Sequence, residues 1–255
     1  MEIVYLIIFF LFGSVFGSFY NVLANRINNH ESIIYPPSHC DRCNHHLFWY
    51  ELIPIISFLF QKGKCRYCHV KLSMMYLFSE IACGILFAVS YYSFGFSYQL
   101  LIALILSSTM IIVTISDLNY LAIPDRFIII PSILILIIKL IFEGLNEFLF
   151  SLLGGIMAFV IMFMIMKIGE FIFKKECLGG ADVKLMFLVG IMLHPLLTLL
   201  VIVLASVIAL PVSLFLLFRN KESVIPFGPF LMLGLLIVYF MKIDVMEVLN
   251  FLIQK

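Results

Sequence analysis

The sequence predicts an all-α membrane protein, a bundle of about eight membrane-spanning helices with one small polar domain. Of its 255 residues, 64% are hydrophobic and only 12% are charged, whereas a soluble domain of this size carries about 25% charged residues. Apolar runs of about 20 residues recur, long enough to cross a hydrocarbon core of about 30 Å. These runs are continuous rather than alternating, so helices, and not a closed barrel, are expected to satisfy the backbone in lipid.

The apolar runs predict eight spans, at residues 3–25, 76–94, 98–116, 127–142, 148–168, 183–193, 196–218 and 227–241. The sixth is short and ends before Pro195, which cannot continue a helix. The fourth is also short, and Lys139 near its end is expected to reach toward the interface. Gly13 and Gly17 predict a close helix contact on the first span. No Lys or Arg precedes that span, so we expect a true first helix rather than a signal peptide.

The distribution of basic residues predicts the orientation. If the N-terminus lies outside, Lys139, Lys242 and Lys255 fall on the outer face, and the other 13 of the 16 basic residues share the inner face. Positive charge collects on the cytoplasmic side of membrane proteins. We therefore expect a multi-pass protein of the cell inner (cytoplasmic) membrane, with its N-terminus outside and its long polar loops in the cytoplasm. Membrane lipids are expected partners. The net charge of +1 gives no indication of nucleic acid.

The sequence divides into three parts, namely a first transmembrane helix at 1–25, a cytoplasmic domain at 26–75 and a transmembrane domain at 76–255. The middle part is too small to build much of a core unaided, so a structural metal would be a natural support.

Two Cys-x2-Cys pairs in the middle part predict a metal site. Cys40 and Cys43 are separated by 21 residues from the second pair, Cys65 and Cys68. Each pair can contribute two ligands to one tetrahedral Zn²⁺, and four thiolates leave no open position for catalysis. The alternative, two disulfides, is disfavoured on a reducing face. The nearby histidines are more often ordinary loop residues than ligands.

Two acidic sites are the candidates for chemistry. Asp117 lies where the third span leaves the bilayer, and Asp182 opens the sixth span after Gly179 and Gly180. The orientation assigned from Lys and Arg alone places both on the cytoplasmic side. A close pair of carboxylates would share a proton, so that one could activate water while the other polarises a peptide carbonyl. The glycines would let a substrate backbone approach closely.

Structural explanations for these acids stay open. An aspartate at a helix end is commonly an interfacial residue or a cap, and Asp182 would favour the dipole of its helix without any catalysis. Asp125, at the start of the fourth span, reads as a cap or an orienting group. Glu80, about one turn into the second span, needs a partner, and either a structural pairing or a functional role would supply one.

The motifs together resemble the bacterial prepilin peptidases, also called type IV leader peptidases. The resemblance covers roughly residues 11–232. The matching segments occur in family order: Gly17 to Val22 with Arg26, the two cysteine pairs, Lys62 to Cys68, Ser79-Glu80, Asp117 to Asp125, Gly179 to Lys184, and Pro226 to Pro229. One position departs from the Gly-x-Gly-Asp motif of the family, because Ala181 stands where Gly is usual.

The resemblance implies a specific activity. The catalytic aspartates of the family fall on Asp117 and Asp182. Such enzymes cut the short basic leader of prepilin or pseudopilin-like single-span proteins on the cytoplasmic side, after a Gly. Competence pseudopilins are among their substrates. Many also N-methylate the new terminus with S-adenosylmethionine, a step associated with the cysteine-bearing domain. The resemblance therefore makes 76–255 a peptidase domain.

Two other functions are compatible with parts of this sequence. The first is a methyltransferase whose membrane part only docks substrate, although residues 26–75 contain no Gly-rich loop of the Rossmann type. The second is a transporter or channel with a zinc-stabilised cytoplasmic domain. Transporters place charge at the bilayer midplane, whereas here the acidic groups gather at one rim.

Overall fold

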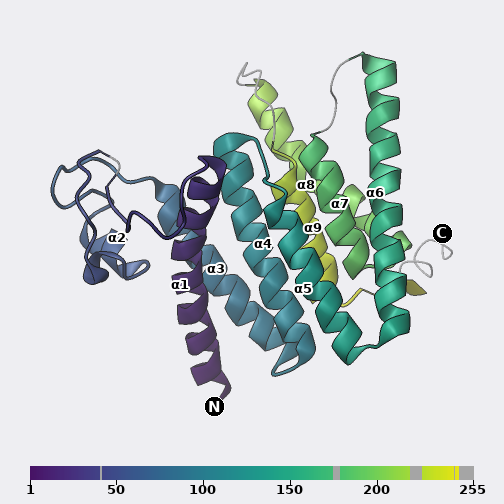
Figure 1. Cartoon of the computed structure of the whole chain (residues 1–255), viewed down its shortest axis with the longest axis horizontal. Coiled ribbons are helices and arrows are strands. Elements are labelled where there is room, and N and C mark those ends of the chain that lie inside the picture. Colours follow the sequence, from purple (N-terminus) through teal and green to yellow (C-terminus); the bar gives the residue numbers. More distant parts are fainter. Residues whose placement is uncertain (41, 175–178, 219–225, 244, 247–255) are drawn as a thin grey trace. The chain divides into compact units, whose positions relative to one another are not determined.

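The structure is a computed structural model that describes residues 1–40, 42–174, 179–218, 226–243 and 245–246. Within these ranges the chain is helical and no strand forms (Figure 1). The elements are α1 Glu2–Asn28, the 3-10 helix η1 Trp49–Glu51, α2 Ile56–Phe60, α3 Met74–Phe94, α4 Tyr98–Tyr120, α5 Arg126–Phe142, α6 Leu145–Phe173, α7 Gly180–Met192, α8 Pro195–Phe218 and α9 Gly228–Phe240.

A helix occupies each of the eight predicted spans, which confirms the all-α fold class. Five helices of the described residues, α1, α3, α4, α6 and α8, are long and apolar enough to cross a membrane. The shorter α5, α7 and α9 have 17, 13 and 13 residues. Pro195 begins α8 directly after α7 ends, so the predicted break falls between two separate helices.

The chain forms two compact units, Met1–Tyr120 and Leu121–Lys255. The domain boundaries at residues 25 and 75 stay a prediction.

In the first unit, α1 packs closely against α3. A Cβ placed on Gly13 would lie 2.6 Å from the carbonyl oxygen of Cys83, and one on Gly17 would lie 2.8 Å from that of Ser79. Both distances are far below a normal contact, so the predicted small-residue contact of the first span is confirmed, and Cys83 is part of it. Side chains larger than hydrogen would force the two helices apart.

Polar side chains fix the register of the three long helices in this unit. The Asn21 amide donates to Ser79 Oγ at 2.5 Å, which joins α1 to α3. Tyr20 donates its hydroxyl to Ser108 Oγ at 2.7 Å, and the Asn28 amide donates to Ser116 Oγ at 3.0 Å, and both of these bonds join α1 to α4. In an apolar surrounding such groups need partners.

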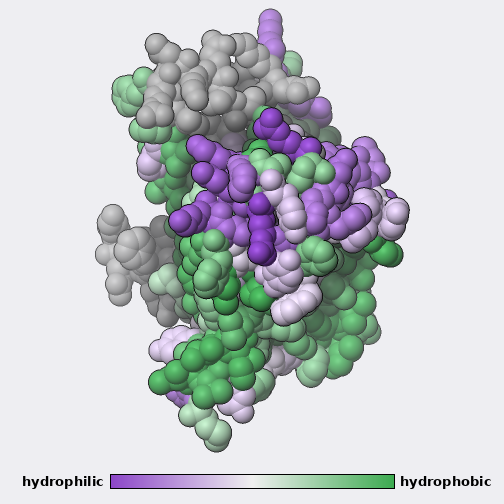
Figure 2. All heavy atoms as spheres, turned by 90° about the vertical axis from the view of Figure 1, so that its left-hand side faces the viewer, coloured by the Kyte–Doolittle hydropathy of each residue, from purple (hydrophilic) through white to green (hydrophobic). Residues whose placement is uncertain are grey.

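The segment between α1 and α3 is polar and loop-rich, and it contains only η1 and α2 as helices. Figure 2 shows hydrophilic side chains gathered over this part of the first unit, next to hydrophobic surface. Arg26, at the end of α1, holds the first part of the segment. Its guanidinium donates to the carbonyl oxygens of Ser32, Ile33 and Pro36 at 3.1, 3.0 and 2.6 Å.

The second unit centres on α7, which packs against α5, α6 and α9. The residues of α7 from Leu188 to Met192 are all buried. A Cβ on Gly190 would lie 2.5 Å from the carbonyl oxygen of Gly154 on α6, and a Cβ on Gly154 would lie 2.6 Å from that of Gly190. The backbones of α6 and α7 therefore touch at this crossing.

Lys139 ties three helices of the second unit together. It is half-buried on α5, and its ammonium donates to Ser151 Oγ on α6 at 2.8 Å and to the carbonyl oxygen of Ile191 on α7 at 2.9 Å. The sequence predicted only that this side chain reaches toward the interface, and it gave no indication of these two bonds. The carbonyl belongs to the last turn of α7, where a cation is favourable and an intrahelical donor is missing.

Lys139→Met is expected to destabilise this unit, because it leaves the Ile191 carbonyl and the Ser151 hydroxyl without their donor. The cost should be about 1–3 kcal/mol, which corresponds to a fall in unfolding temperature of about 2–4 °C per kcal/mol. Thermal unfolding in detergent measures it. Lys167→Met is the control, because Lys167 pairs with Glu170 at an exposed position, where ion pairs contribute little. Equal unfolding temperatures for the two variants would contradict a stabilising role of the Lys139 bonds.

Candidate active site and cysteine cluster

Asp117 lies in the last turn of α4 and is 7% exposed. The residue before it, Ser116, is fully buried and receives the Asn28 amide of α1. One turn further on, Tyr120 donates its hydroxyl to Asn25 Oδ1 at 3.3 Å. These bonds hold the end of α4 against α1, so the backbone that carries Asp117 is fixed on both sides of it.

Asp182 lies in the first turn of α7 and is also 7% exposed. The helix begins at Gly180, and Gly179 is its cap residue in an extended conformation. A Cβ on Gly179 would lie 3.1 Å from Asp182 Oδ2, whereas a Cβ on Gly180 would meet no atom within 4 Å. The first glycine therefore makes room for the carboxylate, and the second borders open space.

Asp125 and Lys184 form a salt bridge within the second unit. Lys184 Nζ lies 2.6 Å from Asp125 Oδ1, with side-chain exposures of 49% and 56%. Asp125 occupies the N-cap position of α5 but makes no side-chain cap bond. The bridge ties the start of α5 to α7, the helix that carries Asp182. The role of Asp125 stays a prediction.

The two aspartates belong to different compact units, Asp117 to the first and Asp182 to the second. Their pairing stays a prediction. What the structure adds is that each one is buried at a helix end.

The four paired cysteines gather into one cluster, as predicted. The four Sγ atoms of Cys40, Cys43, Cys65 and Cys68 all lie within 4.8 Å of one another. Cys40 and Cys68 are 3.7 Å apart, and Cys43 and Cys65 are 4.0 Å apart. Zn–S bonds of about 2.3 Å in a tetrahedron place sulfurs about 3.8 Å apart, so the donor set fits a four-thiolate zinc. The separations also exceed a covalent S–S bond of about 2.05 Å, so no disulfide joins them.

Each Cys-x2-Cys pair forms the same turn. The Cys40 N–H donates to the His45 carbonyl, and the Asn44 N–H donates to the Cys40 carbonyl. The second pair repeats this arrangement with Cys65, His69 and Val70. Asn44 and His69 take left-handed φ values of 53° and 56°, a conformation in which Asn and His are enriched among non-glycine residues.

Backbone amides favour the thiolate of one cysteine in this cluster, Cys40. The N–H of Cys43 lowers the pKa of Cys40 to about 7 from the ordinary value of 9, and the Arg42 N–H adds to the effect. Metal binding requires deprotonated sulfur, so the fold prepares Cys40 for this role.

The side chain of Glu80 binds the backbone of the polar segment. Glu80 Oε2 accepts the N–H of Ile55 at 2.7 Å. Ile55 has φ 63° and ψ −54°, and the N–H of Ile56 bonds to the Pro54 carbonyl at 2.6 Å, which is a tight three-residue turn. A β-branched residue with positive φ is strained by about 1–3 kcal/mol. Of the two options left open for Glu80, the structural pairing is present, because its carboxylate holds this turn against α3.

Comparison with known proteins places the chain in a family. A sequence model of the bacterial peptidase A24 N-terminal domain matches residues 11–94, and that of the type IV leader peptidase family matches residues 104–214. A prepilin leader peptidase/N-methyltransferase of Bacillus subtilis is 38% identical over 186 residues, which cover 73% of this chain and 73% of that protein. This chain belongs to the type IV leader peptidase family.

Further relatives have the same name. The protein of Myxococcus xanthus is 34% identical over 181 residues, which are 71% of this chain and 54% of the relative. That of Vibrio cholerae is 28% identical over 255 residues, which are 94% of this chain and 98% of the relative. No solved structure matches the chain.

Family membership connects the geometry to an activity. Asp117 and Asp182 both fall in the segment matched by the type IV leader peptidase family, while Glu80 and the cysteine cluster fall in the segment matched by the N-terminal domain. The chain is thus an enzyme of this family, and the five long apolar helices among its described residues make it integral to the membrane. Membership disfavours the transporter or channel.

Sequence reasoning missed two residues of the first unit that the structure makes prominent. Arg26, noted only as part of a motif, closes the polar segment through three carbonyls. Glu51 is 7% exposed and was not singled out. The sequence does mark Glu51, because it is the single carboxylate in the otherwise uncharged run from Leu47 to Gln61.

Proposed function

We propose that this chain is a membrane aspartic endopeptidase that removes the basic leader of type IV prepilin or pseudopilin-like proteins at the cytoplasmic face. Asp117 and Asp182 are its catalytic pair. The observation that carries the proposal is their burial at 7% exposure, in contrast to Asp125, whose side chain is 56% exposed. A buried carboxylate at a helix end is costly, and in a membrane protein it marks a functional site by default.

The positions of the two aspartates at opposite helix ends suggest which one is the general base and which one is the general acid. Asp182 is in the first turn of α7, where the helix dipole favours a negative charge, and Asp117 is in the last turn of α4, where the dipole disfavours one. Each effect is typically about 0.3–1 kcal/mol. Asp182 is therefore the better base to take a proton from water, and Asp117 the better acid to polarise the scissile carbonyl.

The substrate class follows from the place of the site. A single-span precursor would keep its apolar segment in the bilayer and its basic leader in the cytoplasm, so the scissile bond would lie at the interface, where water is present. The open space beside Gly180 is suited to an extended backbone passing near Asp182. The relatives are named for prepilin leaders, which supports this class.

The second activity of the relatives, N-methylation, is proposed for this chain as well. It needs S-adenosylmethionine, which supplies the methyl group for the new N-terminal amine. The cysteine cluster is proposed to hold a structural Zn²⁺ that stabilises the segment between α1 and α3, because four thiolates leave no position for a substrate.

Gly179→Ala is expected to slow cleavage while the protein still inserts and folds. The added methyl would lie 3.1 Å from Asp182 Oδ2, so the carboxylate must move by a few tenths of an ångström or rotate. Misplacing a catalytic group by about 1 Å can cost about 100-fold, so a loss of about 10- to 100-fold is expected in a precursor-cleavage assay.

Gly180→Ala is the matched comparison, because no atom within 4 Å would meet its methyl group. If substrate passes there, this variant raises KM for the precursor while kcat is retained, whereas Gly179→Ala lowers kcat. Wild-type kinetics for Gly179→Ala would contradict the steric argument.

The proposed function is tested with the purified chain in lipid vesicles and a prepilin-like precursor whose leader is basic. Mass spectrometry should find a single cut between the leader and the apolar segment. When S-adenosylmethionine is present, the new N-terminus should gain one methyl group. An intact precursor together with robust ion or solute flux through the vesicles would favour the transporter instead.

A further inference from the structure

The polar segment between α1 and α3 leaves five large apolar side chains uncovered. Trp49 on η1 and Phe60 at the end of α2 are 76% and 84% exposed, and Phe48, Ile56 and Leu59 are 50%, 50% and 60% exposed. Because η1 packs against α2, we treat these five residues together as the η1–α2 face. Large apolar groups gathered on the surface of an otherwise polar segment mark a site of interaction.

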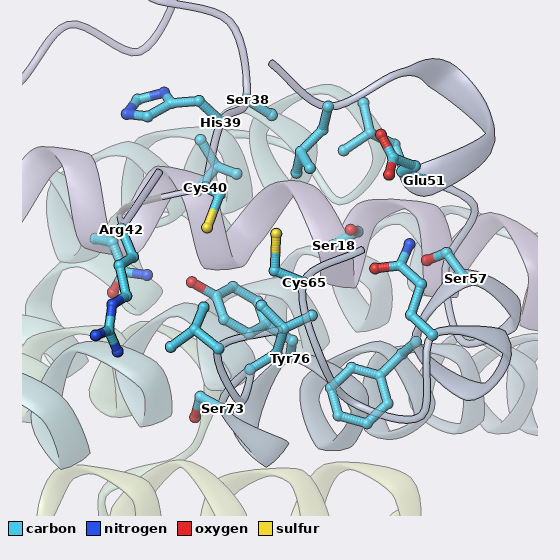
Figure 3. Close-up of a pocket in the computed structure, with 18 of the residues that line it drawn as sticks. Ser18, Ser38, His39, Cys40, Arg42, Glu51, Ser57, Cys65, Ser73 and Tyr76 are labelled. Carbon is cyan, nitrogen blue, oxygen red and sulfur yellow. The ribbon is translucent and has the colours of Figure 1, made fainter. Parts of the chain in front are cut away.

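The other side of α2 is already occupied by the chain itself. Phe58 is buried, and with Ser57 it lines a cavity of about 690 Å³ within the first unit. Figure 3 shows Ser57 in the wall of this cavity together with Ser18 of α1. The short helix therefore has one side directed to the interior and one side left for an external partner.

Contacts within the first unit place α2 beside the second half of α1 and not beyond its end (Figure 1). The N–H of Ile55, directly before α2, bonds to Glu80 of α3. Glu80 in turn lies opposite Gly17, where a Cβ would be 2.9 Å from Glu80 Cα. Since α1 ends at Asn28, Gly17 lies about 16 Å below that end at a rise of about 1.5 Å per residue.

This level corresponds to the boundary of the hydrocarbon core. The apolar run of α1 begins at Ile3 and crosses a core of about 30 Å in about 20 residues, which ends near Val22. Gly17 is thus about 8 Å inside the core. The Glu80 side chain is tilted toward the start of α3, so its partner Ile55, and α2 after it, lie close to the boundary itself.

Basic side chains accompany the η1–α2 face. Lys62 and Lys64 follow α2 directly and are exposed. The Arg66 guanidinium lies 5.7 Å from the ring centre of Tyr50, the residue after Trp49. Glu51 is the only acid from Leu47 to Lys71, and it is buried. Exposed aromatic and aliphatic groups with lysines beside them, and with no exposed acid, are typical of elements that lie in a membrane interface.

We propose that the η1–α2 face inserts into the interface of an anionic bilayer leaflet, with Lys62 and Lys64 at the lipid phosphates. The inference rests on the proposed cytoplasmic position of the segment, because anionic lipids collect in the cytoplasmic leaflet. A lipid surface is favoured over a second copy of the chain because the face lies at the level where α1 leaves the core. Insertion would hold the cysteine-bearing segment at the depth where the scissile bond of a precursor is expected.

The chain contains its own probe for this insertion, because Trp49 is its single tryptophan. The test measures Trp49 fluorescence of the purified, zinc-loaded full chain in vesicles of phosphatidylcholine and phosphatidylglycerol. Some vesicles contain lipids brominated near the headgroup end of the acyl chain, and others contain lipids brominated near its methyl end. Because interfacial elements are buried by about 5–10 Å, we expect stronger quenching by the shallow bromine than by the deep one. Aqueous acrylamide should quench little.

Phe60→Ser removes the most exposed side chain of the η1–α2 face. It should weaken quenching by the shallow bromine and strengthen quenching by acrylamide. Tyr92→Ser is the matched control, because Tyr92 is 79% exposed but lies near the other end of α3. It should leave both kinds of quenching as in the wild type.

The lysines are tested by comparing neutral with anionic vesicles. Bromine quenching of the wild type should be stronger in the anionic vesicles, because each lysine near an anionic surface favours the bound state by about fivefold. Lys62→Gln combined with Lys64→Gln should abolish this difference. Lys167→Gln, an exposed lysine of the second unit, should retain it.

The wild-type measurement alone can overturn the proposal. Trp49 that is quenched by acrylamide and not by brominated lipid would show that the face lies in water. Trp49 that is shielded from both, and loses this shielding when the chain is diluted with excess lipid, would assign the face to a second copy and also overturn the proposal. Bromine quenching in a chain that cuts no precursor would contradict the proposed function and leave the insertion standing.

Discussion

Asp117→Asn and Asp182→Asn should each leave a prepilin-like precursor uncut, although both variants insert into the membrane normally. Each substitution keeps the size of the side chain, replaces one oxygen by an NH2 group and removes the ability to exchange a proton. General acid and base groups contribute about 100- to 10,000-fold to a reaction rate, so the loss of either should reduce cleavage by at least about 100-fold. Co-expression with a candidate precursor, followed by immunoblotting, measures it.

Asp125→Asn is the matched control for these two variants. It also lies at a helix end, but its bond to Lys184 is exposed, and such pairs contribute about 0–1 kcal/mol. Cleavage should fall by less than about fivefold. As a second control, Asp117→Asn should still methylate a peptide that was cleaved beforehand. Normal maturation by either Asp117→Asn or Asp182→Asn would end the catalytic-pair hypothesis.

Loss of one cysteine of the cluster should release the metal and loosen the segment between α1 and α3. Protein purified without chelator is expected to contain about one zinc per chain. Cys65→Ser removes one of four ligands from a site whose sulfurs lie within 4.8 Å of one another. Structural zinc sites contribute about 10–16 kcal/mol of apparent binding free energy, so this small segment should become sensitive to protease. Elemental analysis and limited proteolysis provide the two measurements.

Cys83→Ser is the control for the metal prediction. This cysteine is buried in the contact between α1 and α3 and lies outside the cluster. It should retain full zinc content. Zinc well below one per chain in the wild type, or unchanged zinc in Cys65→Ser, would contradict a four-cysteine zinc site.

The helices could be predicted from the sequence because lipid imposes a simple rule. A continuous apolar run must be a helix, and its length sets its span. For the same reason Gly13 and Gly17 could be assigned to a helix contact, because small residues one turn apart have few other uses in such a run. The cysteine cluster was predictable because its chemistry depends on residue type and spacing.

The tertiary contacts of single residues were not predictable in this way. Gly154 and Gly190 are 36 positions apart in sequence, and nothing in their neighbourhoods indicates that their backbones meet. The carbonyl partner of Lys139 lies on α7, and a side chain gives no sign of which backbone group it will reach. Glu51 could be noticed as the single carboxylate of an uncharged run, but its burial and its cap bond are properties of the folded segment.

The residues of the candidate site could be predicted from the sequence, but their surroundings could not. Asp117 and Asp182 could be selected because an acidic residue at the mouth of a membrane helix is a functional candidate by default, and the structure adds their burial. Ala181 follows Gly180 on α7 and is partly buried. The glycine that lies next to the Asp182 carboxylate is Gly179. The departure from the usual family motif therefore leaves the residue that makes room for Asp182 intact.

The most direct test of the central claim is an experimental structure of the enzyme in lipid, at a resolution that shows side chains. Catalysis by an aspartate pair requires one water to reach both groups, so the nearest carboxylate oxygens of Asp117 and Asp182 should lie within about 6 Å, the span of two hydrogen bonds. A separation above about 10 Å, beyond what a modest closure on substrate could remove, would contradict the account.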